Sequence, residues 1–380
     1  MNFELDEELT MVRDMAREFA EQELLPRATR HDREERIDPE VLQQLGALGM
    51  WGLTIPEEYG GSGLSNLALA LVLEELNYAC AATGVTVSVH NSLVSAPLRK
   101  FATEEQRKRW LPRLASGEVI GAYSLSEAAS GSDAAALEAS AARDGDQWVL
   151  NGAKLWVTSG AIAGLFIVYV RTDPDAPKTR GITAFVVERD APGFSIGKSE
   201  KKTGIRGSST TELLLENVRV GDDAVLGELN RGFHIAMDTL DGGRIGIAAQ
   251  SIGIGRACLD ASVKYAQERE QFGKPIGQFQ AIQWKLADMC TRLDGARLLT
   301  HKAAWLRDRG EDSSQMAAEA KLAASTTVNF CADECVQIHG GAGYTDEFHV
   351  ERLFRDARIT EIYEGATDIQ RIVIARKLLK

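Results

Sequence analysis

Near its C-terminus the chain reads Arg358-Ile359-Thr360-Glu361-Ile362-Tyr363-Glu364-Gly365-Ala366-Thr367-Asp368-Ile369-Gln370-Arg371. One carboxylate, Glu364, stands between an aromatic residue and a glycine, directly before a predicted helix. Thr367 is the expected N-cap of that helix, and Gln370, three residues later, completes the spacing of a capping box. The glycine lets a ligand approach the backbone closely, so Glu364 is a candidate general base in a short, anchored turn. The alternative is a surface glutamate in an ordinary loop.

Long helices precede this turn. Residues 235–271, 279–309 and 314–339 contain few helix breakers after their starts, which predicts an antiparallel helical bundle. Residues 4–118 also have a helical period, with a breaker cluster from Pro56 to Gly63 between two helices. The chain therefore begins and ends in helical regions.

The middle of the chain has a different pattern. Residues 165–170, 182–187 and 211–215 are rich in residues that favour strands. Two further strand patterns, residues 148–150 and 154–158, flank Asn151-Gly152, which predicts a hairpin with a tight type I′ turn. We therefore expect an α+β multidomain protein. Its three parts are an all-α domain at 1–118, an antiparallel β-barrel-like domain at 119–228 and a helical bundle at 229–380.

Composition restricts the class of function. Lysine and arginine number 43 against 55 aspartate and glutamate residues, giving a net charge of −12, which argues against a nucleic-acid partner. No apolar run approaches the roughly 20 residues that cross a bilayer. The acidic, amphipathic start of the chain resembles neither a secretory signal nor a transit peptide, so we expect a cytoplasmic or matrix-like location.

The five cysteines predict neither a disulfide framework nor a metal centre. Cys331 and Cys335 are four residues apart in a helical pattern, and His339 is the one obvious further ligand nearby. A zinc site needs more ligands than these, so we expect buried free thiols and no metal.

The sequence resembles the acyl-CoA dehydrogenase family at several separated motifs. Residues 358–371 resemble its C-terminal active-site segment, and Gln337-Ile338-His339-Gly340-Gly341-Ala342-Gly343-Tyr344, continuing through Asp356, resembles its second signature. The first signature is similar to Ser124-Leu125-Ser126-Glu127-Ala128-Ala129-Ser130-Gly131-Ser132-Asp133. Two flavin-contacting segments resemble Trp156-Val157-Thr158 and Arg269-Glu270-Gln271-Phe272-Gly273. The resemblance covers nearly the whole chain and looks closest to the short-chain, butyryl-CoA branch.

This resemblance implies a C-terminal four-helix bundle and the FAD-dependent conversion of an acyl-CoA to its trans-2-enoyl-CoA, as in fatty acid β-oxidation. A carboxylate removes the α hydrogen as a proton while the β hydrogen leaves as hydride to flavin N5. Glu364 matches the base. Its backbone N–H and a flavin hydroxyl would polarise the thioester carbonyl, an effect worth several kcal/mol. Some relatives carry the base one residue before the arginine that matches Arg244, and that position is Gly243 here.

Contacts to FAD are also implied by the resemblance. Taken alone, Trp156 is a large strand residue of the kind that most often lies in the core. The segment from Gln337 would reach the adenosine end from a neighbouring subunit, so a homotetramer is expected. The residues matching cofactor contacts are Tyr123, Leu125, Ser126, Trp156, Thr158, Arg269, Phe272, Gln280, Gln337, Gly340, Gly341, Ala366 and Asp368.

The resemblance further assigns substrate contacts. Arg244 could instead be a cation on the helix surface that pairs with Asp241. Gln250 and Thr360 match positions that shorten the acyl pocket, but Gln250 could instead face solvent. We expect a preference for straight C4 to C6 acyl chains and electron-transfer flavoprotein as acceptor. Branched-chain, medium-chain and oxygen-reactive, oxidase-like activities remain alternatives. The residues matching substrate contacts are Ser132, Asp241, Arg244, Gly365, Gln250 and Thr360.

Three positions depart from the family pattern. Ala128 stands where the first signature has proline, Ser159 where asparagine is common, and Ala366 where threonine is frequent. The last of these puts one flavin hydrogen bond in doubt, unless Thr367 supplies it.

Overall fold

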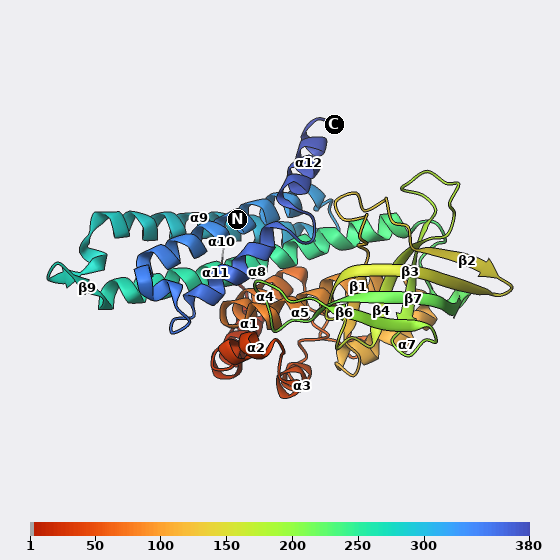
Figure 1. The fold of residues 1–380 in the computed structure, drawn as a ribbon, viewed down its shortest axis with the longest axis horizontal. Helices are drawn as coiled ribbons and strands as arrows, with labels where there is room; N and C mark the ends of the chain where they lie inside the picture. The colour runs from red at the N-terminus through yellow and green to blue at the C-terminus, as the bar shows by residue number, and fades with distance from the viewer. Residues whose placement is uncertain (1–3) are drawn as a thin grey trace.

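A computed structural model describes residues 4–380, and it has the predicted order of helices, sheet and helices (Figure 1). The N-terminal region lies beneath the centre of the molecule in Figure 1, the sheet lies at one side, and the long C-terminal helices run across to the other. The helices of the N-terminal region are α1 (Glu7–Phe19), α2 (Ala28–Glu34), α3 (Pro39–Ala47), α4 (Asn66–Ala79), α5 (Ala81–Ser88), α6 (Ala96–Phe101) and α7 (Glu104–Ala115).

Local signals explain where several of these helices begin. The side chain of Asp6 accepts a hydrogen bond from the Leu9 N–H at the start of α1, and Thr103 forms a capping box with Gln106 at α7. The breaker cluster lies, as predicted, between α3 and α4. Helix α4 is buried on nearly all sides because α1, α8 and α9 pack around it.

The middle region folds into one sheet of eight strands. Its order is β6-β7-β3-β2-β4-β5-β8, and β1 joins it in parallel to β4, while most other pairs are antiparallel. Large apolar side chains from β3, β4, β5 and β7 fill its interior. The strands are β1 (Gly121–Ser124), β2 (Ser140–Asp144), β3 (Gln147–Thr158), β4 (Leu165–Arg171), β5 (Ile182–Glu188), β6 (Phe194–Ser199), β7 (Thr210–Gly221) and β8 (Val225–Leu226).

The predicted hairpin at Asn151-Gly152 is wrong. Both residues lie inside β3, which runs without a turn and has a register shift at this point. The hairpin is instead the one that joins β2 to β3, where Asp144 pairs with Gln147. Gly152 is needed for packing, because a Cβ atom there would lie 2.5 Å from Cβ of Ala139.

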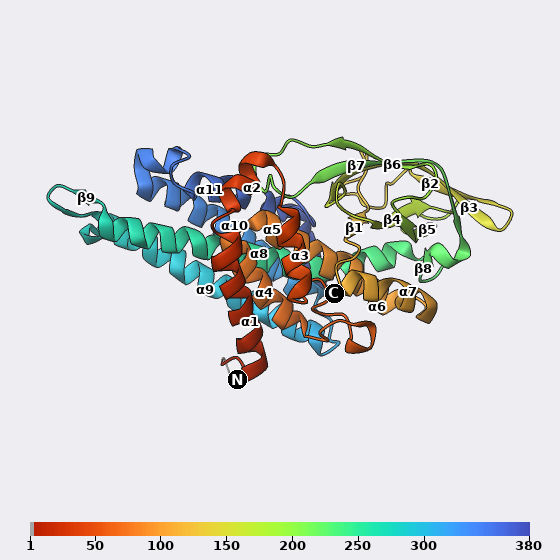
Figure 2. The same ribbon diagram turned by 90° about the horizontal axis from the view of Figure 1, so that it is seen from below.

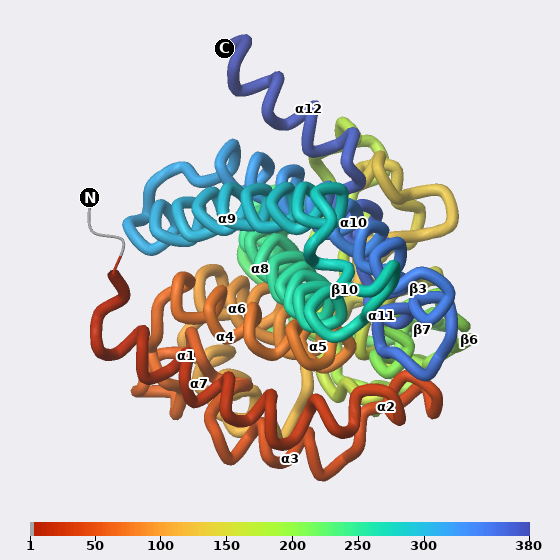
Figure 3. Tube along the Cα trace, turned by 90° about the vertical axis from the view of Figure 1, so that its left-hand side faces the viewer, coloured from red at the N-terminus to blue at the C-terminus, as the bar shows by residue number. Residues whose placement is uncertain are grey.

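The C-terminal region contains the predicted long helices. They are α8 (Gly232–Glu268), α9 (Gln280–Asp308) and α10 (Ser314–His339), followed by the shorter α11 (Val350–Arg358) and α12 (Thr367–Leu378). A small hairpin of β9 (Glu270–Gln271) and β10 (Lys274–Pro275) joins α8 to α9 at the end of the molecule farthest from the sheet (Figures 1 and 2). Helix α12 stands away from the body of the molecule (Figure 3).

The three regions share their hydrophobic cores. One buried cluster joins Val85 of α5 to Ile254 of α8, Val328 of α10 and Leu353 of α11. Another joins α7, β4 and β5 to the first turns of α8. Because α8 contacts both other regions, it fixes the helical bundle against the edge of the sheet. In residues 4–380 we find no helix with both the length and the apolar character needed to cross a membrane.

Candidate active site

The turn that carries Glu364 has an unusual backbone. Residues Ile359–Glu361 form a single 3₁₀ turn, and Glu364 and Gly365 then adopt φ angles of 51° and 91°. Two successive left-handed residues reverse the chain before α12 begins. Gly365 suits the second position because a side chain there would be strained, and its Cβ would lie 2.6 Å from Nε2 of Gln370.

The predicted capping box is wrong. Helix α12 begins after Ala366, which is its N-cap and has no side chain to cap it. Thr367 Oγ1 instead donates to the carbonyl of Glu361 at 3.2 Å, and Gln370 Nε2 donates to the carbonyls of Gly365 at 2.7 Å and Glu364 at 3.3 Å. The reversed backbone turns its carbonyls toward α12, so Gln370 satisfies the turn rather than its own helix.

The carboxylate of Glu364 faces α8 at Gly243. A Cβ atom at Gly243 would lie 1.9 Å from Oε2 of Glu364, and that oxygen is buried without a hydrogen-bond partner. Burial raises the pKa of Glu364 to about 7, against the opposing positive charges of Lys321 and Arg244. The alternative of a surface glutamate is therefore wrong. A buried carboxyl group with a free oxygen and a pKa near neutrality is suited to accept a proton.

Arg244 is one turn along α8 from the Asp241 side chain and pairs with it. Arg244 is only 4% exposed, so it is not a helix-surface cation, although the predicted ion pair is present. Asp241 Oδ1 also accepts a hydrogen bond from Ser314 Oγ at 3.3 Å. Burial raises the pKa of Asp241, and Arg244 opposes this rise. The Nε atom of Arg244 is buried and has no partner, so the guanidinium retains a free donor.

Gln250 and Thr360 are both fully buried. The hydroxyl of Tyr363 donates to Oε1 of Gln250, whereas Nε2 of Gln250 has no partner. Thr360 Oγ1 donates to the Ala357 carbonyl at 2.7 Å. The solvent-facing alternative for Gln250 is therefore wrong. Tyr363, the residue before Glu364, contacts Gln250 directly.

In the middle region, a β-bulge in β3 displays Trp156. The pairing of β3 with β7 shifts between Lys154 and Val157, and Trp156 has a φ of 62° and is 63% exposed. Its alternative as a core residue is wrong, because the bulge turns the side chain outward. Thr158 lies two residues further along β3 and is half-buried.

The first-signature segment lies against β3. Leu155 N–H donates to the Ser126 carbonyl at 2.9 Å, and Leu125 is buried. Tyr123, on β1, packs its ring against Tyr169 at 5.2 Å between centroids, and its hydroxyl has no hydrogen-bond partner. Ser132 lies in the exposed loop that follows.

Sequence reasoning missed a buried ion pair behind this segment. Lys154 is fully buried, and its Nζ contacts Glu127 Oε1 at 2.5 Å and donates to the Leu125 carbonyl at 3.2 Å. The Glu127 carboxylate also accepts from the N–H groups of Glu138 and Ala139. The signal was the position of Lys154, which follows Trp148 and Leu150 on the inward face of the strand.

The residues predicted to hold the adenosine end lie elsewhere. Arg269 and Phe272 are exposed at the β9–β10 hairpin, where Phe272 is 94% exposed, and Gln280 is exposed at the start of α9. Gln337, Gly340 and Gly341 are exposed at the end of α10, and a Cβ atom at either glycine would meet nothing within 4 Å. Figure 1 places the hairpin at the opposite end of the molecule from the sheet that carries Trp156. One chain therefore does not bring the predicted cofactor contacts together. Ala366 and Asp368 lie at the start of α12, where Asp368 pairs with Arg371 at 2.8 Å.

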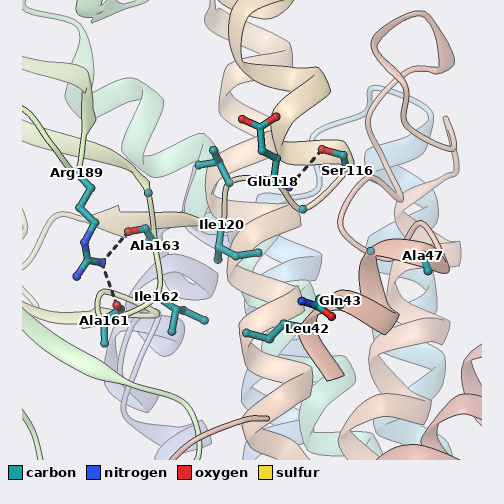
Figure 4. Close-up of a pocket in the computed structure, with 14 residues that line it drawn as sticks. Leu42, Gln43, Ala47, Ser116, Glu118, Ile120, Ala161, Ile162, Ala163 and Arg189 are labelled. Atoms are coloured by element: carbon teal, nitrogen blue, oxygen red, sulfur yellow. Dashed lines mark hydrogen bonds between the residues drawn. The ribbon is translucent and has the colours of Figure 1, made fainter. Parts of the chain in front are cut away.

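A separate groove lies between α3 and the sheet (Figure 4). Its volume is about 760 Å³, and its walls include Leu42, Ile120 and Ile162. Arg189 Nη1 closes one side by donating to the carbonyls of Ala161 at 2.9 Å and Ala163 at 3.0 Å. None of the predicted site residues lines this groove, so it is distinct from the turn of Glu364.

The cysteines expected as buried thiols include Cys331 and Cys335, which are both fully buried and free. His339 Nδ1 lies 2.7 Å from the Cys335 carbonyl, and its ring stacks on Tyr265. Within residues 4–380 no group of three or more potential ligands is placed to hold a metal ion.

Comparison with known proteins gives matches along the whole chain. Residues 6–118, 122–218 and 230–379 match the N-terminal, middle and C-terminal domain models of acyl-CoA dehydrogenase. The mitochondrial short-chain specific acyl-CoA dehydrogenase of Bos taurus is 48% identical over 377 residues, which is 99% of this chain and 91% of that protein.

Two solved structures have nearly the same fold. Butyryl-CoA dehydrogenase from Megasphaera elsdenii is 41% identical, with a TM-score of 0.98 and full coverage of both chains. A chain from a structure of the electron transferring flavoprotein of Acidaminococcus fermentans is 43% identical, also with a TM-score of 0.98 and full coverage of both chains. With all three of its regions matched in order, the chain belongs to the acyl-CoA dehydrogenase family.

Proposed function

We propose that this enzyme converts a short-chain acyl-CoA to the trans-2-enoyl-CoA with Glu364 as the base. One observation carries the proposal: Oε2 of Glu364 is buried and unpartnered, and the pKa of its carboxyl group lies at about 7. A carboxylate in contact with water would be a much weaker base, because its pKa would lie near 4.3. Burial by the protein alone thus moves the proton affinity of this carboxylate toward neutral pH.

Four features of the chain support the cofactor assignment. Trp156 is turned outward by a bulge, Tyr123 has a free hydroxyl, the backbone of Leu125 and Ser126 is held against β3, and Glu364 has a free oxygen. These are the residues that the resemblance assigns to the flavin ring and to the base. Trp156 leaves an exposed surface, and Tyr123 and Glu364 leave unpartnered polar atoms, that a cofactor or substrate could contact. FAD supplies an electron sink for hydride, which amino-acid side chains do not provide.

The protein would contribute proton removal, orientation and exclusion of water. Glu364 would take the α proton, and its backbone N–H would donate to the thioester carbonyl and polarise it; the bound cofactor would supply a second hydrogen-bond donor. Asp241, Arg244, Ser132 and Gly365 would hold the substrate. Filling the site with substrate displaces water, which strengthens these interactions.

A short acyl chain is supported by the buried pair below the turn. Gln250 is fully buried and accepts a hydrogen bond from Tyr363, and Thr360 is equally buried. The resemblance assigns both positions to the floor of the acyl pocket, where polar side chains would leave no room for more methylene groups, so we expect butyryl-CoA to be preferred over palmitoyl-CoA. The short-chain dehydrogenase of Bos taurus and the butyryl-CoA dehydrogenase of Megasphaera elsdenii support the same substrate class.

Assembly as a homotetramer is supported by the separation of the cofactor contacts. Phe272 and Trp284 expose 94% and 64% of their surface near the hairpin, and the glycines at the end of α10 leave open space beside them. A second copy would complete the adenosine site. The match to a chain from the Acidaminococcus fermentans structure supports electron-transfer flavoprotein as the electron acceptor. Cytoplasmic location remains a prediction.

The deciding experiment is anaerobic titration of the FAD-loaded protein with butyryl-CoA, following flavin absorbance. Bleaching in the wild type and not in Glu364→Gln is the expected result. Bleaching with palmitoyl-CoA but not with butyryl-CoA would overturn the short-chain assignment. Equal bleaching in the variant would remove Glu364 as the base.

A further inference from the structure

We propose that Lys321 of α10 is a positioning residue that anchors the turn of Glu364 and places a positive charge beside the carboxylate without touching it. The proposal rests on the assignment of Glu364 as base and deepens it. Neither the sequence motifs nor the resemblance pointed to this lysine.

The anchor is a hydrogen bond to the backbone of the turn. Lys321 is fully buried, and its Nζ donates to the Gly365 carbonyl at 2.8 Å. Gln370 Nε2 donates to the same oxygen at 2.7 Å from the other side. Side chains from α10 and α12 therefore clamp one carbonyl group.

This clamp explains how Glu364 keeps its left-handed backbone. A non-glycine residue in such a conformation costs about 1–3 kcal/mol and persists where its surroundings fix it. The two hydrogen bonds to Gly365 fix the residue directly after Glu364. Their loss would release the turn and move the carboxylate away from Gly243.

The charge of Lys321 acts through space. Within residues 4–380 no carboxylate oxygen lies within ion-pair distance, 4.0 Å, of its Nζ. Burial lowers the pKa of Lys321 to about 8, and the charge of Glu364 is the main influence that opposes this. In turn, Lys321 is the first of the charges that oppose the rise in the pKa of Glu364. The two groups are coupled although they are not in contact.

Separation matters for a base. A direct ion pair would occupy a carboxylate oxygen and lower its proton affinity strongly, leaving a poor proton acceptor. By bonding to a main-chain carbonyl, Lys321 compensates part of the burial of Glu364 while Oε2 stays free. The titratable groups that face this pair are Arg244 on α8, Tyr123 on β1, Tyr363 within the turn and Glu361 in the preceding 3₁₀ turn.

Three variants separate the anchor from the charge. Lys321→Met removes both, Lys321→Gln keeps a neutral donor, and Lys321→Arg keeps charge and donor. The titration of the protonated Glu364 carboxyl group is followed by infrared spectroscopy of the resting protein, with Glu364→Gln to assign the band. The single-turnover rate of flavin reduction by butyryl-CoA is measured against pH in parallel.

We expect the titration midpoint of Glu364 to rise by about one pH unit in Lys321→Met and Lys321→Gln, because an opposite charge stabilises a carboxylate by about this much or more. Lys321→Arg should keep the wild-type midpoint. At about pH 9 and above, where the carboxylate is ionised in all variants, Lys321→Gln should keep the wild-type rate and Lys321→Met should lose about tenfold. Lys108→Met, on the exposed face of α7, is the control.

An unchanged midpoint in the Met and Gln variants would overturn the charge role, and equal high-pH rates in Met and wild type would overturn the anchor. If Lys321→Met fails to fold, the Gln and Arg variants still decide the charge role, and Gln370→Met, which removes the second donor, tests the clamp. Flavin reduction by Glu364→Gln at the wild-type rate would overturn the role of Glu364 as base but not the charge role of Lys321. The infrared titration midpoint tests that charge role without any catalytic step.

Discussion

The turn of Glu364 and the β9–β10 hairpin are built in opposite ways. The turn is enclosed by α8, α10 and α12, and its carbonyls and carboxylate are positioned by buried side chains of the same chain. The hairpin projects from the end of the bundle, with Arg269 exposed and Phe272 almost fully exposed. Both regions carry motifs of the family, so the motif alone does not tell whether a site is complete.

The difference concerns what each region has to do. Proton transfer needs a carboxylate fixed to within a fraction of an ångström, which a packed interior provides. The hairpin only needs to meet a cofactor that extends beyond one chain. We therefore expect changes in the turn to alter the chemistry, and changes in the hairpin to alter cofactor retention and assembly.

The largest expected effect is that of Glu364→Gln. Removal of a general base lowers a rate by about 10²–10⁴-fold, so we expect a fall of about a thousandfold in single-turnover flavin reduction. FAD content and oligomeric state should be unchanged, because the amide has the shape of the carboxyl group. A loss of less than tenfold would show that the turn is not where proton removal occurs.

At the hairpin, Arg269→Ser should weaken FAD binding by about tenfold or more, because charge-assisted hydrogen bonds contribute about 1.5–3 kcal/mol. The measurement is fluorescence titration of the apoprotein with FAD. Arg36→Ser, at an exposed position outside the predicted cofactor contacts, is the matched control. If the affinity of Arg269→Ser equals that of the control, the hairpin does not hold the cofactor.

Glycine substitutions compare the packed turn of Glu364 with an open position just after α10. Gly365→Ala should lower the free energy of unfolding by about 1–3 kcal/mol, since its φ is 91° and its Cβ would meet Gln370 at 2.6 Å. Gly341→Ala should cost far less, because a Cβ atom there meets nothing within 4 Å. Thermal unfolding of the FAD-loaded proteins measures both. Equal losses would contradict the view that only the turn is tightly packed within one chain.

The smallest expected effect is on stability as a function of pH. The pKa of Glu364 is raised in the folded state to about 7, so the folded protein binds a proton that the unfolded chain has released. This contribution is fully present below about pH 4.5 and is lost as the pH rises through 7. At pH 8, Glu364→Gln should therefore be more stable than the wild type, by about 1 kcal/mol. The advantage should shrink as the pH falls toward 5. A melting temperature of Glu364→Gln at pH 8 that is no higher than that of the wild type would contradict this expectation.

Much of the fold could be predicted because its signals are local. The limits of α10 follow from a helical period without breakers, and the strands β4 and β5 follow from runs of strand-forming residues. Asn151-Gly152 led to a wrong hairpin prediction, because a glycine can be required by a close packing contact as well as by a turn. Ala139, whose contact requires that glycine, is 13 residues away in sequence, and no local pattern reveals it.

The residues of the candidate site also differ in whether a local sequence signal points to them. Glu364 could be predicted as a candidate base because its aromatic and glycine neighbours are adjacent in sequence and resemble a family motif. Lys321 and Lys154 were missed because the backbone groups they hold lie 44 and 29 residues away. Lys321 lies on the buried face of α10 among alanines, and Lys154 lies in line with Leu150 on the inward face of β3. These inward-facing positions were the available signal.

Gly243 also constrains how such an enzyme can evolve. With only 1.9 Å between a Cβ atom at Gly243 and Oε2 of Glu364, positions 243 and 364 compete for one space. A lineage that relocates its carboxylate to α8 must first empty position 364, and one that returns it must first empty position 243. With Glu364 as the base, either substitution alone gives a collision or a protein without a base.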